Sequence, residues 1–122
     1  NQDVFFADID LTDLARTIRK IKFEFKEVSK FPAVSRDLAL LIDKNVEFSQ
    51  IEQIARKTEK KLLKRVELFD VYEGKNLPSG KKSYAINFIL QDDAKTLDDK
   101  AIDTVMKKLI HQLTTQLHAE LR

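Results

Sequence analysis

The chain has 122 residues, of which 43% are hydrophobic and 34% charged, and this combination predicts one folded domain with one core and excludes a disordered chain. The net charge of +2 does not by itself indicate a nucleic-acid binder, and the absence of cysteine excludes disulfides and thiolate metal sites and is compatible with a reducing cytoplasm. Since no apolar run approaches about 18 residues and no signal peptide opens the chain, we expect a soluble protein.

Residues 1–27 are predicted to form a segment separate from the compact domain. Val4 to Leu11 carries large apolar residues on both faces, which is typical of a strand buried in a larger sheet. A short helix is expected at Thr12 to Ile18, and an extended stretch with alternating apolar and charged residues follows over residues 21–26. Because the chain has no initiator Met and runs almost directly into an apolar strand, we interpret it as a piece of a longer protein, with residues 12–27 as a connector.

The compact part of the chain begins near residue 28. Phe31-Pro32 is a break, because the residue before a proline is pushed out of the helical region. Ser35 to Asp43 is then predicted to be a strand with apolar residues on alternate positions. Ser49 and Glu52 have the spacing of a capping box, which predicts the start of a helix with apolar residues at helical spacing.

Two strands, a helix and a short strand complete the domain. Lys64 to Tyr72 and Lys82 to Gln91 are predicted strands, and the loop between them, which holds both glycines of the chain, is long enough for a wide hairpin. Thr96 and Asp99 have the spacing of a helix cap, and an apolar stripe at helical spacing follows them. Residues 119–122 are predicted to be a short final strand.

This order of elements predicts an α+β fold of the ferredoxin-like, split βαβ type. The sequence strand, helix, strand, strand, helix, strand forms a four-stranded antiparallel sheet with two helices packed on one face. The opposite side of the sheet is then left uncovered, and we call it the open face. No repeat or low-complexity segment competes with this interpretation.

Side chains alternate along a strand, so each strand residue can be assigned to one face of the sheet. In the third strand the larger apolar residues must face the helices, namely Tyr84, Ile86, Phe88 and Leu90. In the second strand, Phe69 and Val71 are assigned to the helix side. The residues assigned to the open face are Asp37, Ala39, Leu41, Leu68, Asp70, Tyr72, Ser83, Ala85, Asn87 and Ile89.

The predicted open face has the composition of a surface that binds a flat, polar ring. Tyr72 offers an aromatic ring for stacking, and small residues such as Ala39 leave room beside it. Polar groups come from Asp70, Ser83 and Asn87. Cations at the predicted rim of this face are Arg36, Lys75, Lys81 and Lys82. From composition alone, docking on another domain is the more common role of such a half-apolar face.

The sequence carries no recognisable catalytic or metal site. Its two glycines cannot form a phosphate-binding loop, and no nucleophile motif accompanies its serines. His111 and His118 are two helical turns apart, about 10.5 Å, which is too far to share a metal ion. The acidic pairs at residues 92–93 and 98–99 lie near a helix start, where carboxylates act as caps. A run of basic residues is expected to form a solvated helix edge or to extend the basic rim: Lys57, Lys60, Lys61, Lys64 and Arg65.

Two stretches of the sequence resemble a known family. They are residues 31–40, FPAVSRDLAL, and residues 66–83, which contain VELFDVYEG and GKKS. Together with the Gln91-Asp92 turn and the TLDD helix start, they are similar to the ferredoxin-fold anticodon-binding domain that ends the beta subunit of bacterial phenylalanine-tRNA ligase. The resemblance covers residues 28–122. Residues 4–10 are similar to the last strand of the preceding domain of that subunit, so residues 1–27 are expected to be its tail and a connector.

The resemblance implies a tRNA-binding, non-catalytic part of a cytoplasmic aminoacyl-tRNA synthetase. The parent ligase uses ATP and Mg²⁺ and is a heterotetramer of two alpha and two beta subunits, of which alpha is catalytic. This part is expected to bind the anticodon stem-loop of phenylalanine tRNA, with no cofactor, DNA or membrane. Tyr72 would stack on the first anticodon base, while Asp70, Ser83 and the backbone near Ala39 would bond base edges. Further tRNA contacts are expected at Arg36, Asn87, Lys75, Lys81 and Lys82.

Two other functions remain open at this point. A ferredoxin-like regulatory domain would bind a small ligand, but such domains usually carry a glycine in the loop after the first strand, and residues 43–47 contain none. A protein-docking module would use the apolar residues Leu41, Leu68 and Ile89. Docking predicts that Tyr72→Ala disturbs subunit assembly and leaves anticodon discrimination unchanged.

Overall fold

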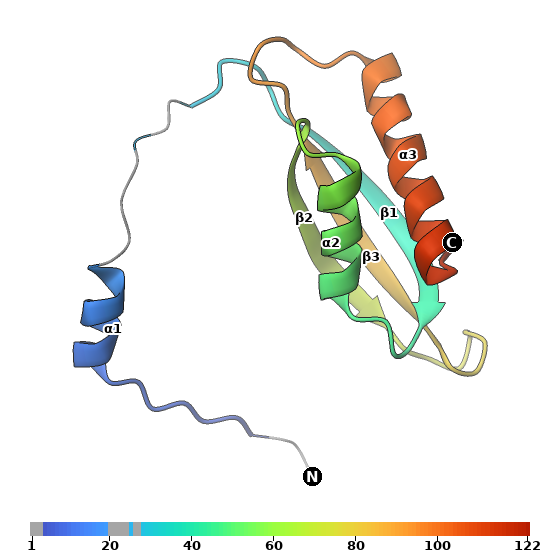
Figure 1. Ribbon diagram of the computed structural model, residues 1–122. Coiled ribbons are helices and arrows are strands. Elements are labelled where there is room, and N and C mark those ends of the chain that lie inside the picture. The colour runs from blue at the N-terminus through green and yellow to red at the C-terminus, as the bar shows by residue number, and fades with distance from the viewer. Residues whose placement is uncertain (1–3, 20–24, 26–27) are drawn as a thin grey trace.

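The computed structural model describes residues 4–19, 25 and 28–122, and Figure 1 shows the arrangement of its elements. Their bounds are α1 (Leu11–Ile18), β1 (Val34–Asp43), α2 (Phe48–Thr58), β2 (Leu63–Tyr72), β3 (Lys81–Leu90), α3 (Asp99–Leu117) and β4 (Glu120–Leu121). Neighbours in the sheet follow the order β2-β3-β1-β4, and each pair is antiparallel. Helices α2 and α3 lie on the same side of this sheet (Figure 1). The predicted ferredoxin-like α+β fold is therefore confirmed.

The N-terminal segment differs from its prediction. The short helix is confirmed as α1, but the strand expected from Val4 to Leu11 is wrong, because residues 4–10 have no regular structure. A strand needs a neighbour for its backbone hydrogen bonds, and no described strand pairs with this segment. The extended stretch expected over residues 21–26 lies outside the described residues except for Phe25.

Asp10 begins α1 by capping it. Its Oδ1 accepts hydrogen bonds from the backbone N–H of Thr12 at 2.7 Å and of Asp13 at 3.4 Å. These two backbone bonds hold the pKa of the Asp10 carboxyl below its ordinary value. α1 buries none of its residues, so local capping of this kind is the visible support of the helix.

The core lies between the sheet and the two helices α2 and α3. β1 and β3 pair over their whole length, from Val34 opposite Leu90 to Asp43 opposite Lys81, and so form the centre of the sheet. Side chains with no exposure come from both layers, namely Leu40, Ile42, Ile86, Phe88, Leu90, Ile51, Leu109 and Leu113. All the third-strand residues predicted to face the helices are buried here. Apolar burial on one side of the sheet thus fixes which side remains open.

The two domain helices begin at residues other than those predicted. α2 starts after Glu47, whose side chain and that of Gln50 form the capping box, so the box expected at Ser49 and Glu52 is wrong by two residues. α3 starts after Asp98, whose Oδ1 accepts from the N–H of Ala101 at 2.7 Å, instead of after Thr96. In both cases a carboxylate two residues from the expected cap supplies the acceptor that the first helical turn needs.

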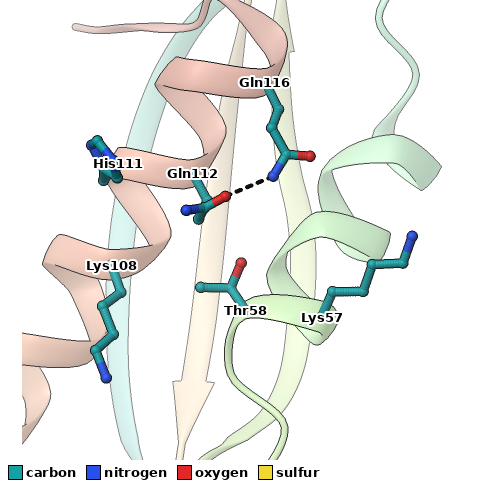
Figure 2. A pocket seen from close by; sticks show the side chains of 6 residues that line it. All are labelled: Lys57, Thr58, Lys108, His111, Gln112 and Gln116. Carbon is teal, nitrogen blue, oxygen red and sulfur yellow. Dashed lines mark hydrogen bonds between the residues drawn. The ribbon is translucent and has the colours of Figure 1, made fainter.

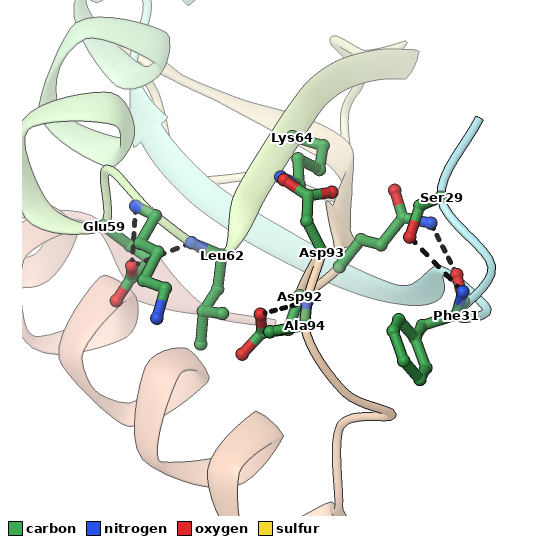
Figure 3. A network of polar contacts seen from close by, with 10 residues as sticks. Ser29, Phe31, Glu59, Leu62, Lys64, Asp92, Asp93 and Ala94 are labelled. Carbon is green, nitrogen blue, oxygen red and sulfur yellow. Dashed lines mark hydrogen bonds and ion pairs between the residues drawn. The ribbon is translucent and has the colours of Figure 1, made fainter. Parts of the chain in front are cut away.

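A polar network ties three segments together at one end of the sheet (Figure 3). The Nε2 of Gln91 donates to the carbonyl of Phe31 at 2.6 Å, which holds the chain entering β1 against the end of β3. Lys64 forms an ion pair with Asp93 at 2.7 Å, and buried Asp92 accepts from the N–H of Ala94 at 3.0 Å. The Gln91-Asp92 turn of the sequence pattern therefore anchors the entry of the domain.

β2 departs from simple alternation, and this changes which of its residues face outward. Its register with β3 shifts between Leu63 and Arg65 and again between Leu68 and Asp70. The second shift leaves Phe69 without a partner and 60% exposed, while Leu68 packs against the core. The assignment of Phe69 to the helix side and of Leu68 to the open face is therefore wrong, because a bulge inserts one extra residue into the strand.

After the second bulge the predicted faces of β2 return. Asp70 lies opposite Ala85, Val71 opposite Tyr84 and Tyr72 opposite Ser83. Val71 is thus on the helix side of the sheet as predicted, although it is 48% exposed near the end of the strand. The second bulge thus places Asp70 and Tyr72 on the open face, where β2 ends and β3 begins.

Candidate functional site on the open face

One end of the open face is hollowed into a cavity of about 390 Å³. It is lined by Ala39, Asp70, Tyr72, Ser83, Ala85 and Arg122, and we call it the open-face hollow. The strand register explains this grouping, because Ala85 of β3 lies opposite both Ala39 of β1 and Asp70 of β2. Two small side chains therefore form the floor, and polar or aromatic side chains surround it. Four residues predicted from the sequence to contact one base are brought together here.

Tyr72 supplies the only aromatic ring among the lining residues of the hollow. It is the last residue of β2, lies opposite Ser83 and is 38% exposed. Its ring lies against Gly74, where an added Cβ would overlap the Tyr72 hydroxyl. The absence of a side chain at Gly74 thus leaves the space that the Tyr72 ring occupies as a platform.

Arg122 is a lining residue that the sequence prediction missed. Its guanidinium lies over the Tyr72 ring, 5.5 Å from the centroid, in the geometry of a cation–π contact. Its backbone N–H donates to the carbonyl of Ala39 at 3.0 Å, next to the β1–β4 pairing of Leu40 with Leu121. The predicted strands contained the information needed to place Arg122 here. Antiparallel pairing of the predicted last strand with the first brings residue 122 to residue 39.

Asp70 and Ser83 offer unused polar groups to the hollow. Within the described part of the chain, neither side chain makes a hydrogen bond or an ion pair. Ser83 is only 6% exposed, yet no buried side-chain oxygen lacks a partner among the described residues, so its hydroxyl reaches the hollow. A carboxylate acceptor and a hydroxyl donor and acceptor are therefore available beside an aromatic platform.

Asn87 lies on the open face as predicted but outside the hollow. Its Nδ2 donates to the Oδ1 of Asp37 at 2.5 Å and also to the hydroxyl of Ser35. Both partners belong to β1, and Asp37 lies directly opposite Asn87 in the register. The amide is thus occupied in a cross-strand contact and does not line the hollow.

The predicted basic rim is only partly formed. Lys81 is on the open side of the sheet but forms ion pairs with Asp43 at 3.1 Å and Glu120 at 3.9 Å. Lys75 is exposed in the loop between β2 and β3. Arg122 is therefore the cation that lines the hollow.

Arg36 and Lys82 lie on the helix side, so their assignment to the rim of the open face is wrong. Arg36 is opposite Phe88 in the register, and its guanidinium lies 3.8 Å from the carboxylate of Asp99 on α3. Lys82 is opposite Ile42, is buried, and places its Nζ 4.6 Å from the centroid of the Tyr84 ring. Strand alternation, applied to these residues as it was to their neighbours, would have placed them correctly.

The basic run that follows α2 also fails to form one surface. Lys64 pairs with Asp93 and Arg65 pairs with Glu67, at 2.7 and 3.0 Å. Lys57 instead lies on the helix layer of the domain. The run therefore does not extend a basic rim around the open-face hollow.

The described residues contain no group of three or more His, Cys, Asp or Glu side chains that could hold a metal ion. Among the helices that the structure describes, none is long and apolar enough to cross a membrane. The open-face hollow can stack a planar ring on Tyr72. Asp70 and Ser83 can then form hydrogen bonds to the edge of that ring.

Comparison with known proteins shows which family and which proteins the chain is similar to. Residues 29–122 match the family model described as the ferredoxin-fold anticodon binding domain. The whole chain is 59% identical to part of the phenylalanine–tRNA ligase beta subunit of Bacteroides thetaiotaomicron, and 99% of it is 54% identical to that of Porphyromonas gingivalis. A more distant relative is the same subunit of Clostridium acetobutylicum, 36% identical over 97% of the chain. The chain spans 15% of the length of each of these relatives.

Proposed function

Because the chain belongs to the family of ferredoxin-fold anticodon binding domains, we propose that its open-face hollow receives one base of the anticodon of phenylalanine tRNA. The observation that carries this proposal is the convergence of Tyr72, Asp70 and Ser83 on a single hollow with a floor of two alanines. Single-stranded loops of RNA are read in this way, by unstacking a base onto an aromatic ring and bonding its edge.

Each lining residue has a distinct role in this proposal. Tyr72 stacks on the first anticodon base, which contributes roughly 1 to 3 kcal/mol. The Asp70 carboxylate accepts hydrogen bonds from N–H groups of the base edge, and the Ser83 hydroxyl bonds a second edge atom. Arg122 is close enough to the ring to contact the phosphate or the outer face of the stacked base.

The backbone near Ala39 has a smaller role than the side chains. The carbonyl of Ala39 already accepts the N–H of Arg122, so only its second lone pair is available to a base. The short side chains of Ala39 and Ala85 matter more, since larger ones would fill the floor of the hollow. The other proposed tRNA contacts are exposed Lys75 and, through its backbone or after exchange of its ion pairs, Lys81.

We propose that the parent protein is a phenylalanine-tRNA ligase and that this part of it discriminates tRNA without taking part in the chemistry. The similarity to ligase beta subunits supports this assignment. An alpha subunit in an α₂β₂ heterotetramer would then carry out the ATP- and Mg²⁺-dependent attachment of phenylalanine in the cytoplasm. Asp70 serves binding alone in this scheme, since it has no second carboxylate beside it in the lining of the hollow.

We also propose that residues 1–27 are the tail of the preceding domain and the connector to residues 28–122. Val4, Phe5 and Phe6 are each about 90% exposed, at 89, 93 and 91%. A row of large apolar side chains with this exposure is unusual on a free domain and is expected to be covered by the rest of the subunit. The match of the family model to residues 29–122 is compatible with that boundary.

Titration of the chain with two RNAs tests the proposed anticodon recognition. One is phenylalanine tRNA, and the other is the same tRNA with its first anticodon base changed. We expect tighter binding of the native anticodon, and we expect Tyr72→Ala to remove that preference. Phe69→Ala is the matched control, because Phe69 is an exposed aromatic residue of the same strand outside the hollow.

Equal, salt-sensitive binding of both RNAs would indicate an electrostatic contact only and would refute base recognition. If Tyr72→Ala instead weakened assembly with the alpha subunit and left the preference intact, the open face would be a docking surface. The small-ligand alternative predicts binding of a metabolite in the absence of tRNA, with no change when Tyr72 is replaced.

A further inference from the structure

A second hollow lies on the opposite layer of the domain, between α2 and α3. It has a volume of about 410 Å³ and is lined by Lys57, Thr58, Lys108, His111, Gln112 and Gln116 (Figure 2). We call it the helix groove. Its volume falls within the range of about 300 to 1,000 Å³ that is typical of ligand sites. No residue of the helix groove is shared with the open-face hollow.

The helix groove carries positive charge without a compensating carboxylate in its lining. Lys57 comes from α2 and Lys108 from α3, so each wall contributes one ammonium group (Figure 2). Neither lysine forms an ion pair with any residue that the structure describes, whereas Arg56, next to Lys57, is paired with Glu52 at 2.8 Å. The flexible stems of the two lysines allow both ammonium groups to turn toward one anion.

Three of the remaining side chains of the groove can donate hydrogen bonds, namely His111, Gln112 and Gln116. The Nε2 of Gln116 donates to the Oε1 of Gln112 at 2.7 Å, which orients the two amides and uses one lone pair of the Gln112 oxygen (Figure 2). The Nε2 of Gln112 makes no hydrogen bond to any described residue and so has free donors. His111 adds a ring nitrogen that can donate. An anion with several acceptor oxygens matches this set better than a cation or a neutral ring.

We propose that the helix groove binds a phosphate group, carried either by a nucleotide or by an RNA backbone. Two lysines match the charge of a phosphate, and the amides and the imidazole supply donors to its oxygens. Lys57, which belongs to the basic run predicted from the sequence, thus binds phosphate in the helix groove and does not form part of the rim of the open face. Since the sheet and core separate the two hollows, an anticodon base on Tyr72 and a phosphate in the helix groove occupy different sites.

Titration of the isotopically labelled 122-residue chain tests this site. The probes are inorganic pyrophosphate, adenosine monophosphate and a short single-stranded oligouridine, each followed by NMR. We expect backbone and side-chain amide shifts at Lys57, Lys108, Gln112 and Gln116. The double variant Lys57→Gln/Lys108→Gln should weaken binding at least tenfold.

A second double variant, Lys60→Gln/Lys100→Gln, is the matched control. It removes the same charge from two exposed lysines that do not line the helix groove, and it should change the affinity less than twofold. All four lysines are exposed, so a melting curve is expected to confirm that both variants are folded. Saturable binding of pyrophosphate and the monophosphate identifies a small-ligand site, while binding of oligouridine alone identifies an RNA-backbone site.

Two results would overturn the proposal. One is an absence of shifts in the helix groove with all three probes. The other is equal weakening by the two double variants, which would mean that the anions sense only net charge. Tyr72→Ala should leave the pyrophosphate titration unchanged, because pyrophosphate has no base to stack on Tyr72, so failure of the helix groove and failure of anticodon recognition are distinguishable.

Discussion

Gly74→Ala should weaken anticodon binding although Gly74 does not line the open-face hollow. An added Cβ would overlap the hydroxyl end of the Tyr72 ring, and that end of the side chain can move away. The backbone of Gly74 does not have the left-handed conformation that a side chain resists, so the fold should tolerate the change. The expected result is a folded domain with a displaced aromatic platform.

The expected loss of affinity for the anticodon stem-loop follows from the stacking on Tyr72 that is lost. Stacking of a base on an aromatic side chain contributes roughly 1 to 3 kcal/mol, so complete loss weakens binding by about 5- to 150-fold. Partial displacement of the ring gives the lower end of that range. The assay is titration of an anticodon stem-loop, combined with NMR of the Tyr72 ring in the free variant.

Gly80→Ala is the matched control, because it should lower stability without weakening RNA binding, the reverse of what is expected for Gly74→Ala. Gly80 has a φ of 82°, a conformation that costs an alanine about 1 kcal/mol, yet nothing lies within 4 Å of its added Cβ. The control should lower the free energy of unfolding and leave the affinity for the stem-loop unchanged. Wild-type affinity of Gly74→Ala, or equal loss in both variants, would refute the role given to the Tyr72 ring.

Four other outcomes follow from the structure. Phe88→Ala should lower the free energy of unfolding by about 3 to 5 kcal/mol in urea denaturation, since Phe88 is fully buried between sheet and helices. Asp98→Ala should lower it by about 1 kcal/mol through loss of the α3 cap, and Asp98→Asn should restore most of that. Because the pKa of Asp10 is lowered in α1, the cap is present above its ordinary pKa and is lost as pH falls through the lowered value, which NMR helical shifts of α1 will follow. Deletion of Arg122 should weaken stem-loop binding in the titration above, whereas Arg19→Ala, at an exposed arginine outside the hollow, should not.

The fold was predictable because apolar spacing and topology agree in this chain. Residues 35–43 and 82–91 place their larger apolar side chains at alternate positions, and the burial of Leu40, Ile86 and Phe88 follows from that spacing. The polar and aromatic residues of the hollow were predictable for the same reason, together with the resemblance to a known family. Alternation then needs only the choice of the helix side to place Ala39 and Ser83 on the open face.

Three of the errors have separate physical causes. Phe69 and Leu68 were misplaced because a bulge changes the alternation, and nothing in the local sequence marks its position. Both helix caps moved by two residues because several side chains close together in the sequence, such as Glu47 and Ser49, are competent acceptors. The strand at residues 4–11 was predicted from its apolar residues and from the resemblance, and neither supplies the neighbouring strand that it needs.

The two bulges of β2 also bear on how the protein behaves at high concentration. β2 is at one edge of the sheet, so the outer side of its backbone has no partner strand among the described elements. A regular edge of ten residues would be a template for pairing with the edge of another molecule. The register shifts near Leu63 and Leu68 break that edge into short pieces that do not match a straight strand. The irregularity that turns Asp70 and Tyr72 toward the open face therefore also protects the domain from edge-to-edge aggregation.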